Sequence, residues 1–292
     1  MDYTLVANSA NREAWLAARR RGVTATDVAT LATGGQKVWS RLKAEKQGLV
    51  KAFQGNRFTA WGLAREPLIA AKVSEWRAWM EPNSWTVAHP DRPEFMATPD
   101  MIGEQTGSLV QIKTANVEKA WDSIPTRYFY QCQWEMFVTG AESNDLVVEY
   151  YRDDPEIGLV VADPFGDPEV WPIDCDEDTI SELVEIAESF LSMGEPSYMD
   201  VLLDDYAVKQ ERVEAAQAEL DEVKALIRKE IGERESFKHV SDSGSVTLTT
   251  PKPSARLDSA ALKKAEPELW ARFAVESTGA PRLLVKPAKE DT

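Results

Sequence analysis

Apolar residues recur with two different periods over the first two thirds of the chain, which predicts helices alternating with strands. We expect helices over residues 11–33 (two helices around a turn), 36–50, 59–77, 127–139 and 177–192. We expect strands over residues 85–88, 95–98, 107–114, 146–151 and 159–162, with 95–98 and 107–114 forming an adjacent pair. The predicted class is α/β (α+β), with a central mixed β-sheet flanked by helices.

The pattern changes after about residue 200. Val213, Ala216, Leu220, Val223 and Ile227 follow one another at spacings of three and four, with charged residues between them. This is typical of a long helix with a narrow apolar stripe. A hairpin over 240–249, a helix over 258–273 and a short strand over 282–285 are predicted next. We therefore divide the chain into a core of residues 1–200 and a C-terminal extension of residues 201–292.

The charge is distributed unevenly along the chain. The overall net charge is −16, but residues 1–140 carry 17 basic and 14 acidic groups. Residues 141–208 hold 20 acidic groups and one basic group, Arg152. The N-terminal half is therefore free to form a basic patch for nucleic acid, while the acidic block is most simply a solvated face. No apolar run is long enough to span a membrane, so a cytoplasmic protein without membrane association is expected.

Cysteine and histidine are too scarce for most transition-metal sites. The chain contains only Cys132 and Cys175, and only His89 and His239. A disulfide framework, a cysteine-rich zinc or iron–sulfur site and a histidine-based centre are therefore disfavoured. Any metal would be a hard cation held by oxygen atoms.

Two neighbouring segments carry the candidate chemistry: Ala97-Thr98-Pro99-Asp100 and Leu109-Val110-Gln111-Ile112-Lys113. Since side chains alternate along a strand, Gln111 and Lys113 share one face, which we expect beside Asp100. Asp100 would hold Mg²⁺, Lys113 would orient or deprotonate a water, and the Ile112 carbonyl is available as a neutral ligand. Alone, this pattern is also compatible with a turn aspartate and a solvated lysine.

Further motifs accompany this pattern in a consistent order along residues 11–195. They are Arg20-Arg21-Gly22-Val23-Thr24-Ala25-Thr26-Asp27, Trp61-Gly62-Leu63-Ala64-Arg65-Glu66, Thr98-Pro99-Asp100 and Tyr128-Phe129-Tyr130-Gln131-Cys132-Gln133. Together they resemble the lambda-exonuclease/YqaJ branch of the PD-(D/E)XK nucleases. The resemblance implies a PD-(D/E)XK nuclease core for this chain.

The resemblance also implies roles for individual residues. Asp100, Gln111, Lys113, Glu66 and Gln131 would be catalytic, and Asp100, Gln111, Glu66 and the Ile112 carbonyl would be the metal ligands. Arg20, Thr26 and Gln133 would bind DNA or a terminal 5′ phosphate. We expect Thr26 to be the N-cap of the helix that follows it, so that the start of this helix contributes partial positive charge to the phosphate pocket.

Position 111 departs from the family pattern because it is Gln where Glu is usual. A glutamine offers one neutral carbonyl oxygen, so Mg²⁺ would lose a charged ligand there. Three explanations remain open: a natural use of Gln, an engineered isosteric replacement, or a chain that has lost catalysis and retained DNA binding.

The resemblance implies a Mg²⁺-dependent exonuclease that uses one or two ions, with Mn²⁺ as an alternative. It would degrade linear double-stranded DNA from 5′ to 3′, leaving 3′ overhangs for a single-strand annealing protein, and would form a homo-oligomer (a trimeric ring). The alternatives are a catalytically impaired DNA-binding module and a related nuclease that trims other DNA ends. Tyr130, Trp134 and Phe137 could stack on single-stranded bases, but their helical spacing is more typical of core packing.

Overall fold

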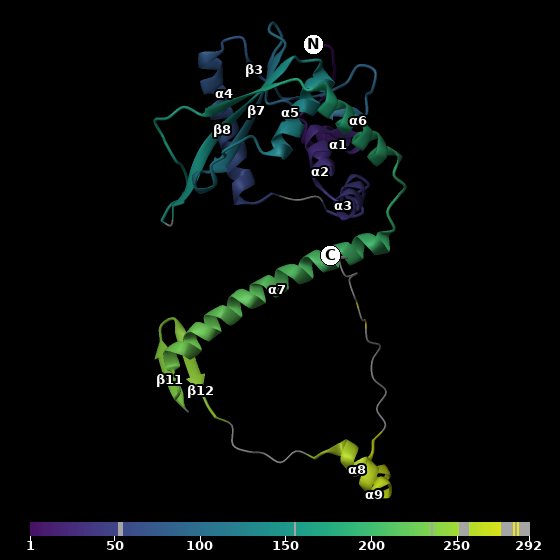
Figure 1. The fold of residues 1–292 in the computed structure, drawn as a ribbon, viewed down its shortest axis with the longest axis vertical. Coiled ribbons are helices and arrows are strands. Elements are labelled where there is room, and N and C mark those ends of the chain that lie inside the picture. Colours follow the sequence, from purple (N-terminus) through teal and green to yellow (C-terminus); the bar gives the residue numbers. More distant parts are fainter. Residues whose placement is uncertain are drawn as a thin grey trace. The chain divides into compact units, whose positions relative to one another are not determined.

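The computed structural model describes residues 1–51, 55–154, 156–234, 236–250 and 257–275, together with Leu283 and Val285. The chain divides into two compact units, Met1–Leu202 and Leu203–Thr292. Figure 1 shows their elements. Among the described residues, no helix combines the length and apolarity needed to cross a membrane.

A mixed sheet forms the centre of the first unit. Its strand order is β10-β8-β7-β6-β3. Strand β9 pairs with the C-terminal end of β8, beyond the part that pairs with β10. The central strands β7 (Ser108–Asn116) and β8 (Ser143–Asp154) run parallel to each other, and the other pairings in this sheet are antiparallel. The remaining strands are β3 (Glu81–Pro82), β6 (Met101–Gly103), β9 (Gly158–Val161) and β10 (Glu169–Asp174).

A second, smaller sheet has the order β1-β4-β5-β2. Its strands are β1 (Thr4–Asn8), β2 (Val23–Thr24), β4 (Trp85–Ala88) and β5 (Phe95–Ala97). Strands β4, β5 and β7 were predicted, but the expected pairing of 95–98 with 107–114 is wrong, because β6 occupies the place beside β7. Pro99 explains the difference, since it has no N–H with which to continue the ladder, and the chain turns there before β6 begins.

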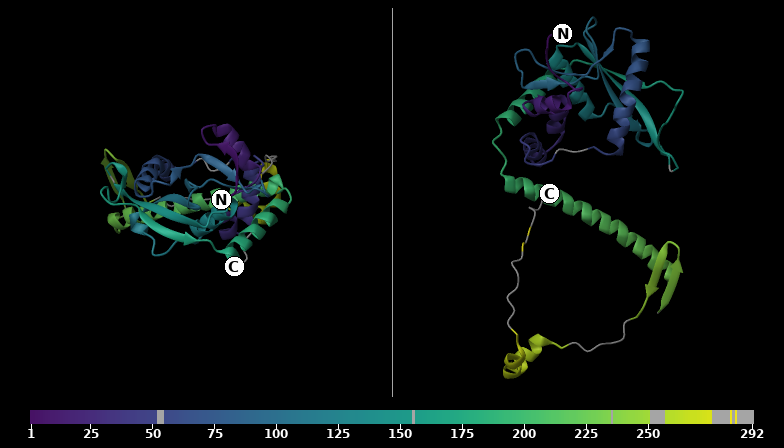
Figure 2. Two further views of the ribbon diagram at one scale, coloured as in Figure 1. Left: turned by 90° about the horizontal axis from the view of Figure 1, so that it is seen from above. Right: turned by 180° about the vertical axis from the view of Figure 1, so that it is seen from behind.

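Helices cover both faces of the central sheet. Helix α4 (Arg57–Trp76) places Ile69 and Val73 against Val110 of β7, in one apolar cluster. Helix α5 (Thr126–Thr139) packs Cys132 in a second cluster with Leu109, the preceding residue of β7. Because consecutive strand residues point to opposite faces, α4 and α5 lie on opposite sides of the sheet (Figures 1 and 2). The predicted class of a mixed sheet flanked by helices is confirmed.

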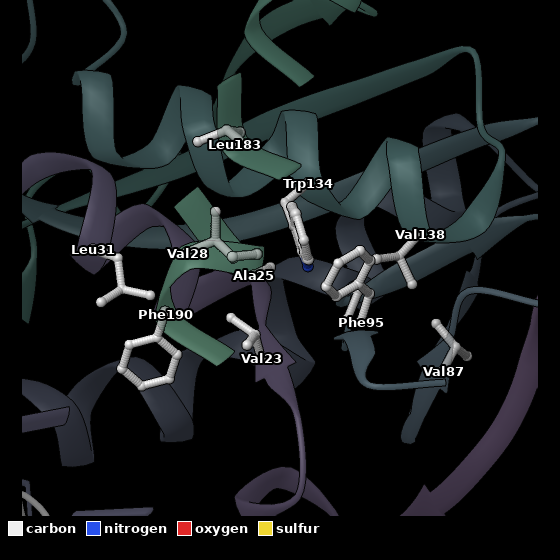
Figure 3. Close-up of a cluster of buried hydrophobic side chains, with 12 residues drawn as sticks. Val23, Ala25, Val28, Leu31, Val87, Phe95, Trp134, Val138, Leu183 and Phe190 are labelled. Carbon is white, nitrogen blue, oxygen red and sulfur yellow. The ribbon is translucent and has the colours of Figure 1, made fainter. Parts of the chain in front are cut away.

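The largest apolar cluster joins α5 to the N-terminal helices and to α6 (Glu177–Ser192). Trp134 is fully buried at its centre, edge-on to Phe95, and its indole N–H donates to the Met96 carbonyl at 3.0 Å (Figure 3). Tyr130 and Phe137 pack against the same cluster. The core interpretation of these aromatic residues is therefore confirmed. Gly140 ends α5 in the left-handed conformation, as expected from the sequence.

The N-terminal segment forms α1 (Arg12–Arg20), α2 (Ala25–Thr33) and α3 (Gln36–Lys46). The expectation that Thr26 is the N-cap of the second helix is wrong. Thr24 is the cap, because its hydroxyl accepts from the Asp27 amide while the Asp27 carboxylate accepts from the Thr24 amide. Thr26 lies in the first turn of α2 and is exposed.

The second unit contains most of α7 (Tyr198–Ile231), the hairpin of β11 (Phe237–Ser241) and β12 (Gly244–Leu248), α8 (Ser259–Ala265) and α9 (Pro267–Phe273). The helix expected over 258–273 is thus two short helices, because the N–H missing at Pro267 allows a new helix to start there. The strand expected over 282–285 lies outside the described residues, except for Leu283 and Val285, which are not in a strand.

Candidate active site

A cavity of about 490 Å³ opens between α2, α4, α5 and the C-terminal half of β7. It lies where α4 and α5, on opposite faces of the sheet, both reach the edge of β7 beyond Ile112. The cavity is lined by Thr26, Phe58, Thr59, Gly62, Leu63, Glu66, Ile112, Lys113, Thr114, Arg127, Tyr128 and Gln131. Three of the residues predicted to be catalytic, Glu66, Lys113 and Gln131, are therefore brought to one cavity.

Asp100 lies at the turn between β5 and β6, beside β7. Its main-chain N–H donates to the Val110 carbonyl at 3.2 Å, and its carboxylate accepts from the Ile112 amide at 2.6 Å. The amide nitrogen of Gln111 also donates to this carboxylate. Asp100 thus keeps its place beside Gln111 and Ile112 although β5 is not the neighbour of β7.

Glu66, on α4, is close enough to Asp100 for the two carboxylates to influence one another. Burial, followed by the charge of Asp100, raises the pKa of Glu66 to about 7, and Lys113 opposes this shift. Burial also raises the pKa of Asp100, again against the effect of Lys113. Two mutually repelling carboxylates beside one lysine form a site that gains stability from an additional positive charge.

The oxygens in this corner fit a hard divalent cation. Asp100 and Glu66 offer carboxylates and Ile112 offers a carbonyl oxygen, which are the ligand types that Mg²⁺ prefers. The amide of Gln111 is not oriented as a ligand of such a cation. Its nitrogen faces Asp100, and its oxygen accepts from Gln131 at 2.8 Å. Within the described residues, no group of three or more His, Cys, Asp or Glu side chains is placed to hold a metal ion.

Sequence reasoning missed a buried carboxylate behind the cavity. Gln131 donates to Glu135 at 3.0 Å, and the other oxygen of Glu135 accepts from Asn144 at 2.9 Å. Glu135 is fully buried, and its pKa is raised to about 7 by burial and by Asp100. Its position four residues after Gln131 on a helix was a usable signal, because such residues share a face.

The expected phosphate pocket is only partly assembled. Thr26 lines the cavity, but Arg20 is exposed at the end of α1 and is not among the lining residues. Arg127, which sequence reasoning missed, lines the cavity together with Thr26 and donates to Thr30 at 3.1 Å. Arg19 points inward instead of Arg20, donates to the Thr98 hydroxyl at 3.3 Å, and has its pKa lowered by burial.

Gln133 does not reach the cavity, which corrects the expectation that its side chain binds DNA or a terminal phosphate. Its side chain is fully buried, donates to the Asp174 carbonyl at 2.8 Å and accepts from the Asp176 amide at 2.9 Å. Residues two apart on a helix point in nearly opposite directions, so Gln133 faces the junction between β10 and α6 while Gln131 faces the cavity.

Part of the N-terminal region is similar to a known protein family. Residues 14–142 match the model of the YqaJ-like viral recombinase domain, which confirms the resemblance found in the sequence. No curated protein matches the chain significantly.

Solved exonuclease structures resemble the chain. The alkaline exonuclease LHK-Exo of Laribacter hongkongensis is 22% identical and covers 70% of this chain and 99% of its own, with a TM-score of 0.48. Its complex with dAMP, with the same identity and coverage, gives a TM-score of 0.50, which shows a shared fold. A phage-related exonuclease of Haemophilus somnus 129PT is 16% identical and covers 65% of this chain and 96% of its own, with a TM-score of 0.43.

Proposed function

We propose that the chain is a divalent-cation-dependent exonuclease acting on the ends of double-stranded DNA. The observation that carries the proposal is that Glu66 and Lys113 line one cavity beside the buried Asp100, whose carboxylate accepts from the amide of the lining residue Ile112 and whose charge raises the pKa of Glu66. The match of residues 14–142 to the YqaJ-like domain supports the same function.

The residues divide the chemistry of phosphodiester hydrolysis among them. Asp100, Glu66 and the Ile112 carbonyl would hold the cation, which polarises the phosphate and lowers the pKa of a water when bound. The ammonium of Lys113, 5.5 Å from the centre of the Tyr128 ring, would orient the attacking water and stabilise charge building on phosphorus. Gln131 would hold the same water by a hydrogen bond.

The mouth of the cavity suits a DNA end. Arg127 and Thr26 offer a guanidinium and a hydroxyl to a terminal phosphate. Phe58 and Leu63 offer apolar surface for a base. We assign this chemistry to residues 1–200 and treat residues 201–292 as an extension.

The finer proposal follows the resemblance: Mg²⁺ with Mn²⁺ as an alternative, 5′-to-3′ degradation, 3′ overhangs for an annealing protein, and a homo-oligomer in the cytoplasm. Duplexes labelled at the 5′ or the 3′ end of one strand would test the polarity. A 5′ label should appear at once as a mononucleotide, while a 3′ label should shorten progressively. Cleavage of closed circular DNA at the same rate as linear DNA would contradict exonuclease action.

The orientation of Gln111 favours a second candidate, a DNA-binding module with impaired catalysis. Its amide nitrogen, rather than its oxygen, faces Asp100, so it supplies no ligand in that orientation. This candidate requires that the chain binds duplex ends with a divalent cation but does not cleave them. Mononucleotide release by the unaltered chain would exclude it.

A further inference from the structure

A chain of side-chain hydrogen bonds runs from the cavity into the interior. Asp100 accepts from Gln111, Gln111 accepts from Gln131, Gln131 donates to Glu135, and Glu135 accepts from Asn144. Two carboxylates, Asp100 and Glu135, therefore accept at the two ends of a pair of amides. Gln111 and Glu135 are almost completely buried, so water cannot easily replace a lost hydrogen bond. Breaking one of these bonds therefore costs free energy.

The acceptors at the two ends determine how both amides are oriented, and Glu135 acts directly on Gln131. A carboxylate oxygen of Glu135 requires a donor from Gln131, which must turn its NH₂ group inward. The same nitrogen donates its second hydrogen to the Gln111 oxygen, at a nitrogen-to-oxygen distance of 2.8 Å. A reversed Gln131 would place its oxygen against both the Glu135 carboxylate and the Gln111 oxygen. With Asp100 and Glu135 ionised, each amide therefore has a single orientation in which every contact pairs a donor with an acceptor.

The orientation leaves one group of Gln131 available. Both of its donated bonds are made inside the protein, and its carbonyl oxygen makes no hydrogen bond within the described part of the chain. Gln131 also lines the cavity beside Lys113. An acceptor at this point suits a water that must give up a proton as it attacks phosphorus.

We infer that Glu135 is a positioning residue, which holds Gln131 so that its carbonyl oxygen faces the cavity and accepts a hydrogen bond from the attacking water. The inference rests on the proposed nuclease function and deepens it. Glu135 is fully buried and does not line the cavity, so it acts through Gln131.

The neighbouring asparagine supplies a matched pair of variants. The Asn144 side-chain oxygen is buried and makes no hydrogen bond with any residue that the structure describes. In Glu135→Gln, the new amide can still accept from Gln131, while its NH₂ group donates to Asn144 after that side chain rotates. In Glu135→Met, which is similar in size, no acceptor remains at position 135, and the Gln111 oxygen is the remaining acceptor of the two described for Gln131. The two variants therefore differ in the orienting bond while both remove the charge.

Kinetics on linear duplex DNA test the role in catalysis. We expect Glu135→Met to lower kcat about 10–100-fold with an unchanged KM, and Glu135→Gln to stay close to the unaltered chain. In a Gln131→Ala background, Glu135→Met should have no further effect, because residues that act through one another are not additive. Additive losses, or a Glu135→Gln variant as slow as Glu135→Met, would overturn the inference.

A measurement without DNA separates this inference from the nuclease proposal. In protein labelled with ¹⁵N-glutamine, the side-chain NH₂ signal of Gln131 should exchange slowly with solvent, and should do so in Glu135→Gln but not in Glu135→Met. If Glu135→Met does not fold, Glu135→Asp, which withdraws the carboxylate by one methylene, takes its place. Equal exchange in all variants overturns the inference. Slow exchange without DNA cleavage would support the orientation and overturn only the nuclease proposal.

Discussion

Replacing Glu149 by alanine removes the carboxylate that ties helix α4 to strand β8. Arg65 donates two hydrogen bonds to Glu149, at 2.6 and 2.8 Å, and only 21% and 7% of the two side chains are exposed. Arg65 directly precedes Glu66, so this ion pair fixes the turn of α4 that carries a candidate cation ligand. The change therefore affects both stability and the geometry of the cavity.

The magnitude follows from burial. Removing one partner of a buried ion pair leaves an uncompensated charge, and we expect a loss of about 3–5 kcal/mol in the free energy of unfolding. The chain offers a control between the same two elements, because Arg57 of α4 pairs with Asp153 of β8 at 59% and 39% exposure. Solvent screens that pair, so Asp153→Ala should cost about 0.2–1 kcal/mol.

Urea unfolding followed by tryptophan fluorescence measures both losses, and cleavage of linear duplex DNA measures the effect on the site. Misplacing Glu66 should slow cleavage by up to about 100-fold in Glu149→Ala, whereas Asp153→Ala should retain the full rate. The double replacement Arg65→Met, Glu149→Leu should recover most of the stability, because an apolar pair leaves no buried charge. Equal losses in the two alanine variants would refute the reasoning.

Three further outcomes are expected. Because the pKa of Glu66 is raised to about 7 and a cation binds its ionised form, lowering the pH from 8 to 6 should increase the Kd for Mg²⁺ about tenfold in calorimetric titration; a pH-independent Kd would argue against Glu66 as a ligand. Gln111→Glu should strengthen Mg²⁺ binding and raise the cleavage rate, since a carboxylate oxygen replaces an amide, and unchanged values would remove position 111 from the ligand set. Arg127→Ala should narrow the difference in cleavage rate between 5′-phosphorylated and 5′-hydroxyl ends, because the guanidinium that binds the terminal phosphate is lost. Arg20→Ala should leave this difference unchanged, and the reverse result would show that Arg20 rather than Arg127 binds the phosphate.

Elements with strong local signals were predicted closely from the sequence. Helix α6 has the expected bounds of 177–192, because a clear apolar period follows the Asp176 cap, which accepts from the Thr179 amide. The end of α5 at Gly140 likewise depends only on local backbone conformation. Asp100, Gln111 and Lys113 could be proposed as neighbours from the sequence because the alternation of side chains along a strand is also a local feature.

Features set by contacts between distant segments were not predictable in this way. Strand β6 has three residues and exists because β7 pairs with it. Whether Arg19 or Arg20 turns inward depends on how α1 packs beside Thr98. The pattern of apolar residues within α1 does not specify this packing. The Glu135 carboxylate is surrounded by partners from α5 and β8, so its role became visible only when these elements were placed together.

The central claim, that the corner between Asp100 and Lys113 hydrolyses DNA with a divalent cation, is tested most directly by one paired measurement. Linear 5′-phosphorylated duplex is incubated with the unaltered chain and with Asp100→Ala, each in Mg²⁺ and in chelator, after circular dichroism has shown that both are folded. We predict mononucleotide release by the unaltered chain in Mg²⁺ alone, and none from Asp100→Ala under either condition. Release by Asp100→Ala at the unaltered rate, or full activity in chelator, would contradict the account.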